Sequence, residues 1–286
     1  MLFRSTADVL PRLLAEKMRA QYPAGVVVEN RTGAGGNIGA EAVFRSDADG
    51  TTFLASPPGP IAINHHLYSK MSFDPTKWVP VTVMATVPNV LAVTPSVPAK
   101  DVRELIALMK AKPDEFKFAS SGIGSTQHIA GEGFKHATGV SMIHVPYKGD
   151  APALQDTLGG QVQFMFAPIT AALPHLKSGK LRALAATSAT RLKVLPDTPT
   201  MAEAGQKDFV VEQWQGVYLP AKTPAPVVQR LNAEINKALK DSAITELADK
   251  LGITLVGGAA KTLADVQTND SATWARVIRA ANIKAD

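Results

Sequence analysis

Two glycine-rich segments hold the residues of this chain that are best suited to chemistry. The first covers 33–39 (Gly-Ala-Gly-Gly-Asn-Ile-Gly), and the second covers 120–126 (Ser-Ser-Gly-Ile-Gly-Ser-Thr). Each follows a predicted strand and precedes a predicted helix, where free backbone N–H groups and the positive end of the helix dipole attract anions. Hydroxyl groups of the second segment add further donors. Both turns could therefore bind a carboxylate or a phosphate.

A nucleotide is the alternative ligand for the first segment. Gly33, Gly35 and Gly39 are spaced G-x-G-x-x-x-G, which differs from the dinucleotide-binding spacing G-x-G-x-x-G. The phosphate-binding motif G-x-x-x-x-G-K-[ST] does not occur in the sequence. A nucleotide-dependent enzyme that uses the Gly33–Gly39 loop stays as an alternative, as does a purely structural role for these glycines in tight turns.

Side chains that could bind a metal or catalyse a reaction lack a supporting motif. His128, Glu132 and His136 share one face of a predicted helix, but H-E-x-x-H is absent, and His128 is better placed to support the second glycine segment. The chain has no cysteine, which excludes disulfides and thiolate sites. The nucleophile motif G-x-S-x-G is also absent. We expect no catalytic residue, no metal and no cofactor.

Helices and strands that position these segments alternate along the chain. This alternation predicts an α/β fold with a mainly parallel sheet and helices on both faces. A run of extended residues over 78–93 is expected to break at Pro88. Strands are expected at 26–28, 52–55, 116–119, 143–145, 162–166, 181–186, 209–219 and 253–256, and helices at 5–21, 40–43, 101–110, 126–137, 152–158, 169–178, 226–240, 244–251 and 263–281.

The length of 286 residues, 45% of them hydrophobic, favours two lobes over a single core. We expect lobe one to comprise 1–93 and 220–286, and lobe two to comprise 94–219. The chain would cross between them near 90–94 and 216–219, and the last helices would pack on lobe one. Two crossing strands form a hinge, and a cleft between hinged α/β lobes is a usual place for a small ligand.

Charge and hydropathy exclude two classes of partner. The formal net charge of +5 is scattered over many predicted elements and is not interleaved with aromatic residues, so we expect no nucleic acid. No window approaches the roughly 18 apolar residues of a membrane span, so the protein is not expected to insert into a membrane. The N-terminal residues, as given, show helical spacing and no export signal.

Many short stretches follow one another along the chain in the order that one protein family shows. They are VVENR (27–31), GAGGNIGA (33–40), AIN (62–64), LY (67–68), FDP (73–75), SSGIGS (120–125) with His128, HVPYKG (144–149), GKLRALA (179–185), LPDTPT (195–200) and EAG (203–205). With these stretches the chain resembles the substrate-binding receptors of tripartite tricarboxylate transporters, or Bug family of periplasmic solute-binding proteins.

The resemblance implies a two-lobed, type II periplasmic-binding-protein fold, the "Venus flytrap". It implies a receptor, not an enzyme, that captures a small organic carboxylate or dicarboxylate and delivers it to the membrane components of a tripartite transporter. A periplasmic location and a monomer are expected with it. A ligand-sensing interaction module without a transporter is a further alternative.

Residues carried over from the family pattern give a candidate ligand site, and two positions depart from the pattern. Arg4-Ser5 stand where the family has a glycine pair, so the first strand of lobe one is expected to be missing. Ala167-Pro168 stand where some relatives carry an acid, which favours a simple carboxylate or dicarboxylate over an amino acid. The candidate ligand-binding residues are Ser120, Ser121, Gly122, Gly124, Ser125, Thr126, His128, Tyr147 and Lys148 from lobe two, and Asp8, Ser56, Pro58 and Gly59 from lobe one.

Overall fold

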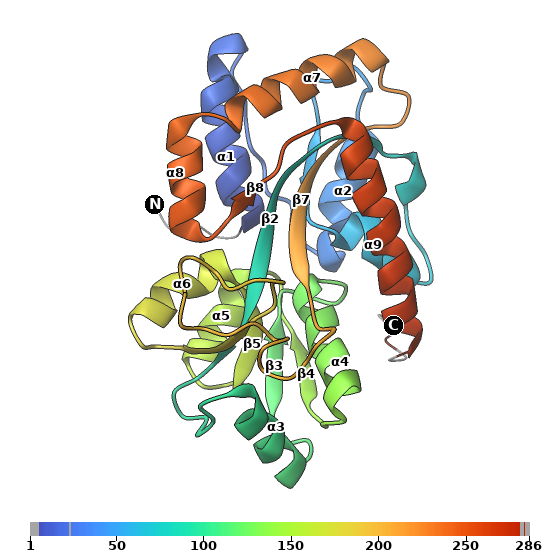
Figure 1. Cartoon of the computed structure of the whole chain (residues 1–286). Coiled ribbons are helices and arrows are strands. Elements are labelled where there is room, and N and C mark those ends of the chain that lie inside the picture. Colours follow the sequence, from blue (N-terminus) through green and yellow to red (C-terminus); the bar gives the residue numbers. More distant parts are fainter. Residues whose placement is uncertain (1–5, 23, 281–282, 284–286) are drawn as a thin grey trace.

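A computed structural model describes residues 6–22, 24–280 and 283. Figure 1 shows two α/β regions, one above the other, with two long strands running between them. These strands are β2 (Val79–Val93) and β7 (Glu212–Leu219). The upper region contains α1, α2, α7 and α8, and the lower region contains α3 to α6 (Figure 1).

The strands form an open sheet in the order β1-β7-β2-β5-β3-β4, with β6 and β8 also paired to β2. The prediction of a mainly parallel sheet is wrong. Among the described strands, β3 is parallel to β4 and β5, whereas every pairing of β2 and β7 is antiparallel. The sheet is mainly antiparallel because the long strand β2 forms antiparallel pairs with four strands, β5, β6, β7 and β8. The other strands are β1 (Leu54–Ser56), β3 (Lys117–Ser120), β4 (Ile143–Pro146), β5 (Phe164–Pro168), β6 (Arg182–Ala186) and β8 (Thr254–Leu255).

The expected break at Pro88 does not occur, because β2 continues through it. Pro88 lies opposite Glu212 of β7, and the next residue, Asn89, lies opposite Pro168 of β5. Proline has no backbone N–H to donate. Its position is tolerated because it coincides with the point where β2 exchanges one set of partners for another.

The expected strand at 26–28 is also not formed. The residues from 24 to 33 have no regular secondary structure, and the Val27 side chain is 90% exposed. An apolar run becomes a strand only when a neighbouring strand supplies hydrogen bonds, and no described strand pairs with this one. The family glycine-pair position at Arg4-Ser5 lies outside the described residues.

Local signals place the helices close to where they are expected. Asp101 caps α3 by accepting a hydrogen bond from the Glu104 amide, and Gly139 ends α4 with a φ of 68°. In the part of the chain described, no helix is long and apolar enough to span a bilayer. The helices are α1 (Thr6–Met18), α2 (Asn37–Phe44), α3 (Val102–Ala111), α4 (Thr126–Thr138), α5 (Asp150–Leu158), α6 (Ile169–Lys177), α7 (Ala225–Ala238), α8 (Ser242–Leu251) and α9 (Ala260–Ala280).

The last helix, α9, contacts both regions and not the upper one alone, which corrects the expectation for the C-terminal helices. Leu263 near its start is buried with Trp214 and Tyr218 in the upper region. Trp274 and Ile278 near its end are buried in the cluster that contains the core of the lower region. In Figure 1 this helix descends beside α4. The two regions are therefore joined by packing as well as by β2 and β7.

Candidate ligand-binding site

The second glycine segment forms the strand-to-helix turn that the sequence predicts. Strand β3 ends at Ser120, and Ser125 caps α4 by accepting a hydrogen bond of 3.2 Å from the His128 amide. Gly122 and Gly124 have φ angles of 133° and 82°, which side-chain-bearing residues adopt only with strain. The turn therefore presents the N-terminal end of α4, a helix of 13 residues, at one edge of the lower region.

Two stacked histidines support this turn from behind. The ring centroids of His128 and His144 lie 4.2 Å apart, and His144 Nε2 is 2.7 Å from the Ser120 hydroxyl. The Gly124 amide donates to His128 Nδ1 over 3.3 Å. Burial, helped by nearby positive charge, lowers the pKa of His128 to about 3 and that of His144 to about 4. Both rings are therefore neutral near pH 7, as a hydrogen-bonding support requires.

The face that carries His128, Glu132 and His136 is not arranged as a metal site. The Glu132 carboxylate forms an ion pair with Lys135, and His136 is exposed while His128 is buried. No group of His, Asp and Glu side chains in the described part of the chain is placed to bind a metal ion.

Ser121 is held by internal hydrogen bonds. Its amide donates to Gln127 Oε1 over 2.5 Å, and Gln127 Nε2 donates to the Asp150 carboxylate over 2.6 Å. Burial raises the pKa of Asp150, although hydrogen bonds from Gln127 and Ser121 act against this rise. The Ser121 amide is thus occupied by the protein, and it fixes the shape of the turn.

Three loops meet at one place, which we call the loop junction: Gly35 of the first glycine segment, Gly59 and Asn64 after β1, and Ile123 and Gly124 of the second segment. The Asn64 Nδ2 atom donates to the Gly35 carbonyl over 3.1 Å. A Cβ atom added at Gly35 would lie 2.6 Å from the Ile123 carbonyl oxygen, and one added at Gly59 would lie 2.9 Å from the Gly35 carbonyl oxygen. A Cβ atom at Gly124 would collide with Asn64 Oδ1. Glycine is needed here because backbones from the two regions touch.

Unpaired buried amides lie on the strands that run between the regions. The side-chain nitrogen and oxygen of Asn89 and of Gln215 have no hydrogen-bond partner within the described residues, and the same holds for Asn64 Oδ1. Gln213 lies on the same face of β7 as Gln215, and its Oε1 accepts a bond of 3.4 Å from the Thr126 hydroxyl. An unpaired buried polar group costs about 1–3 kcal/mol. These groups are suited to a polar ligand or bridging water.

The residues predicted for the site from the sequence do not include Asn64, Asn89, Gln213 or Gln215. A signal for the last two was available, since Gln-x-Gln interrupts an otherwise apolar extended run at 213–215. The Asn64 contact could not have been found in this way, because it joins segments that lie 29 residues apart in the sequence.

The remaining predicted site residues are placed in different surroundings. Ser56 ends β1, is buried and donates to the Pro57 carbonyl, and Pro58 precedes the helical turn Gly59–Ile63. The Tyr147 hydroxyl donates to Asp156 over 2.8 Å, and Lys148 is exposed. Asp8, in the first turn of α1, accepts hydrogen bonds from Arg12 and Asn30. The described contacts thus bring Gly59 and Gly124 together at the loop junction, and they join Asp8 to neither.

Two α/β regions joined by long strands, with glycine-rich loops touching at the boundary, form the architecture of a periplasmic solute-binding protein. The family described as "Tripartite tricarboxylate transporter family receptor" matches residues 10–283. The chain belongs to this family. Bug proteins are among its relatives, as the resemblance in the sequence implied.

Known relatives cover nearly the whole chain. Protein BugT of Bordetella pertussis is 37% identical over 281 residues, which are 98% of this chain and 86% of BugT. The structure titled "R. palustris Rpa4515 with adipate" has a TM-score of 0.93 and 36% identity, and covers 98% of this chain and 95% of that one. MatC from Rhodopseudomonas palustris, with bound malate, has a TM-score of 0.91 and 30% identity, and covers 96% and 95% of the two chains.

Proposed function

We propose that this protein is a periplasmic receptor that captures a small organic carboxylate or dicarboxylate and delivers it to the membrane components of a tripartite transporter. The ligand would lie between the two lobes, with 1–93 and 220–286 forming one and 94–219 the other. It would be released unchanged, because the protein acts as a binding module and not as an enzyme.

The observation that carries the proposal is the position of the α4 N-terminus beside unpaired amides. Thr126, in the first turn of α4, is hydrogen-bonded to Gln213, and Gln215 on the same face of β7 keeps two unpaired polar atoms. A helix N-terminus stabilises a negative charge, and side-chain amides can both donate to and accept from a carboxylic acid or its water shell. The relatives with bound adipate and malate support the same ligand class.

The expected ligand is a carboxylate without an ammonium group. Strand β5 ends in Ala167 and Pro168, both buried, which offer no acidic group to an ammonium. Binding of adipate, malate, succinate, aspartate and glutamate, measured by isothermal titration calorimetry, tests this expectation. Tighter binding of the amino acids than of the dicarboxylates would contradict it. Chemical change of the acid after incubation with the protein would contradict the assignment as a receptor.

A pair of matched variants tests the place of binding. Thr126→Val removes the hydroxyl at the start of α4, and Thr138→Val removes the hydroxyl at the end of the same helix, where it donates to the Phe134 carbonyl. We expect Thr126→Val to weaken carboxylate binding about fivefold, the value of one hydrogen bond of about 1 kcal/mol, and Thr138→Val to leave it unchanged. Equal effects of the two variants would place the ligand elsewhere.

A further inference from the structure

A large groove lies between α4 and α9, on a part of the molecule that the loop junction does not use. Its volume is about 970 Å³, and β2, β7, α4, α9 and the segment 205–212 all contribute to its walls. Its described lining contains none of Gly35, Gly59, Asn64 or Gly124. We call it the hinge groove, because its walls come from both regions. Volumes of about 300–1,000 Å³ are typical of pockets for small molecules.

The walls of the hinge groove are mainly apolar. Val210 and Val256 are 48% and 47% exposed, and they are two of the five large apolar side chains that are exposed in the described part of the chain. Both line this groove, together with Val83, Ile129, Val266 and Val277. A ligand that covers these side chains gains about 25 cal/mol for each Å² of apolar surface removed from water.

Two carboxylates in the same walls have no cationic partner. Asp270 Oδ2 accepts a hydrogen bond of 2.8 Å from the Trp214 indole, and no ion pair reaches Asp270 among the described residues. The Glu212 side chain, which is half-buried, takes part in no hydrogen bond or ion pair in the same part of the chain. Burial raises the pKa of both groups. Lys207 and Arg276 also line the groove, and both are exposed to solvent, which screens their charge.

Two tryptophans complete the lining of the groove. Trp214 and Trp274 line the hinge groove and are 4% and 5% exposed. Aromatic rings attract a desolvated ammonium through their electron-rich faces, in addition to contacting an apolar body. Carboxylates, indoles and aliphatic side chains therefore favour one chemical class of ligand, an amine on an apolar body.

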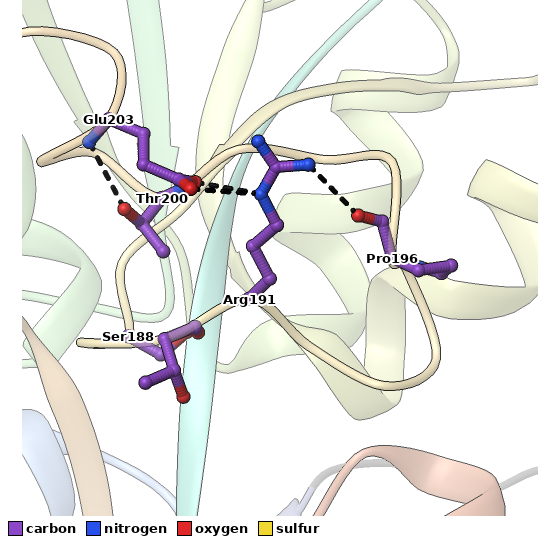
Figure 2. A network of polar contacts seen from close by, with 6 residues as sticks. Ser188, Arg191, Pro196, Thr200 and Glu203 are labelled. Carbon is purple, nitrogen blue, oxygen red and sulfur yellow. Dashed lines mark hydrogen bonds and ion pairs between the residues drawn. The ribbon is translucent and has the colours of Figure 1, made fainter.

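The wall formed by 205–212 is held in place by a polar network in the preceding loop. Figure 2 shows Arg191 reaching the Glu203 carboxylate, at 2.9 and 3.1 Å, and the Pro196 carbonyl, at 3.2 Å. Glu203 also accepts from the Thr200 amide, and its own amide donates to the Thr200 hydroxyl. This reciprocal pair is the arrangement of a capping box, and it fixes the path of the chain towards residue 205. The network thus orders the chain that leads into this wall of the groove.

We propose that the hinge groove is a second ligand site, separate from the carboxylate site, and that it takes a small amphiphilic amine. The ammonium would lie between Glu212 and Asp270, and the apolar body would lie against Val256, Trp214 and Trp274. The proposal rests on the groove alone and does not depend on the proposed function.

Tryptophan fluorescence offers a direct test with 4-phenylbutylamine as the probe. The chain has three tryptophans, two of which line the hinge groove, and Trp78 instead contacts Phe44, with ring centroids 5.2 Å apart. We expect a saturable change in emission with the amine. The alcohol and the acid of the same skeleton, 4-phenylbutanol and 4-phenylbutyrate, should bind at least about tenfold more weakly, because one ionic contact in a desolvated site is lost or reversed.

Two neutralising variants locate the binding. Glu212→Gln should weaken amine binding by about fivefold or more, whereas Glu115→Gln, which removes an exposed carboxylate paired with Lys112, should not change it. Adipate binding by Glu212→Gln should equal that of the unchanged protein, so failure of one site is distinguished from failure of the other. The proposal is overturned if the amine causes no saturable change, if the alcohol binds as tightly as the amine, or if Glu212→Gln binds the amine normally.

Discussion

Replacement of Gly124 by alanine tests whether the three loops must meet for the ligand to bind. Gly124 has a φ of 82°, and a Cβ atom there would collide with Asn64 Oδ1. The side chain of Asn64 is held by bonds of 3.1 Å to the Gly35 carbonyl and 2.7 Å to Asn37 Oδ1. The new methyl group can be accommodated only if Asn64 moves and gives up these bonds, or if the loops separate.

The size of the effect follows from these contacts. Two hydrogen bonds worth about 0.5–1.5 kcal/mol each give a penalty of about 1–3 kcal/mol. Since about 1.4 kcal/mol is a factor of ten, carboxylate binding should weaken between about fivefold and about 150-fold. Gly139→Ala is the matched control, because Gly139 has a φ of 68° and no atom lies within 4 Å of its added Cβ. Both variants carry the backbone strain of about 1–2 kcal/mol, so both should melt at a lower temperature.

Two measurements separate the effect of backbone strain from that of the collision with Asn64. They are calorimetric titration with adipate and thermal unfolding of the ligand-free variants. We expect similar losses of melting temperature, and weaker binding by Gly124→Ala alone. Asn64→Ser added to Gly124→Ala should restore part of the affinity, since the shorter side chain removes the collision. Equal affinity of Gly124→Ala and Gly139→Ala would refute the reasoning, because the loops would then not need to touch in the ligand-bound protein.

Three further predictions concern stability and the buried polar groups. Burial lowers the pKa of His144 from 6.5 to about 4, so the unfolded chain binds a proton more readily, and the free energy of unfolding should fall as the pH drops through this range. Urea unfolding at several pH values measures this change of the free energy of unfolding with pH, and in His144→Gln it should be smaller by about 1 kcal/mol per pH unit. An unchanged pH dependence in the variant would mean that another group causes it. Gln215→Leu should raise the melting temperature of the ligand-free protein, because it removes a buried unpaired amide that costs about 1–3 kcal/mol of stability. The same variant should bind adipate more weakly. A fall in melting temperature would show that the amide has hydrogen-bond partners. Gly131→Ala in α4 should destabilise the fold by about 1–3 kcal/mol, because its Cβ would overlap the Phe118 ring. Gly133→Ala in the same helix should stabilise the fold by up to about 1 kcal/mol, because the nearest atom to its Cβ is 3.8 Å away. Chemical denaturation that ranks the two variants the other way would contradict this packing.

Local sequence signals predicted much of the fold because they act over a few residues. The helices expected at 101–110 and 126–137 lie within one residue of α3 and α4 in the structure. Strand pairing is different, because a strand is completed by a partner far away in the sequence. The valines at 26–28 have a strand-like composition but no described partner, and they remain irregular. The antiparallel role of β2 was missed for the same reason.

By itself, the sequence determined that two glycine-rich turns lead into helices and that the chain belongs to a family of carboxylate-transporter receptors. Glycine spacing and helix starts are local properties, and the ordered family stretches need no coordinates. Only the tertiary structure decided what surrounds these turns: Asn64 lies against Gly35 and Gly124, and His144 is hydrogen-bonded to Ser120. It also left the buried side-chain amide of Gln215 on β7 unpaired among the described residues. These neighbours come from separate segments, and no local rule relates their positions, because the close packing of the whole chain brings them together.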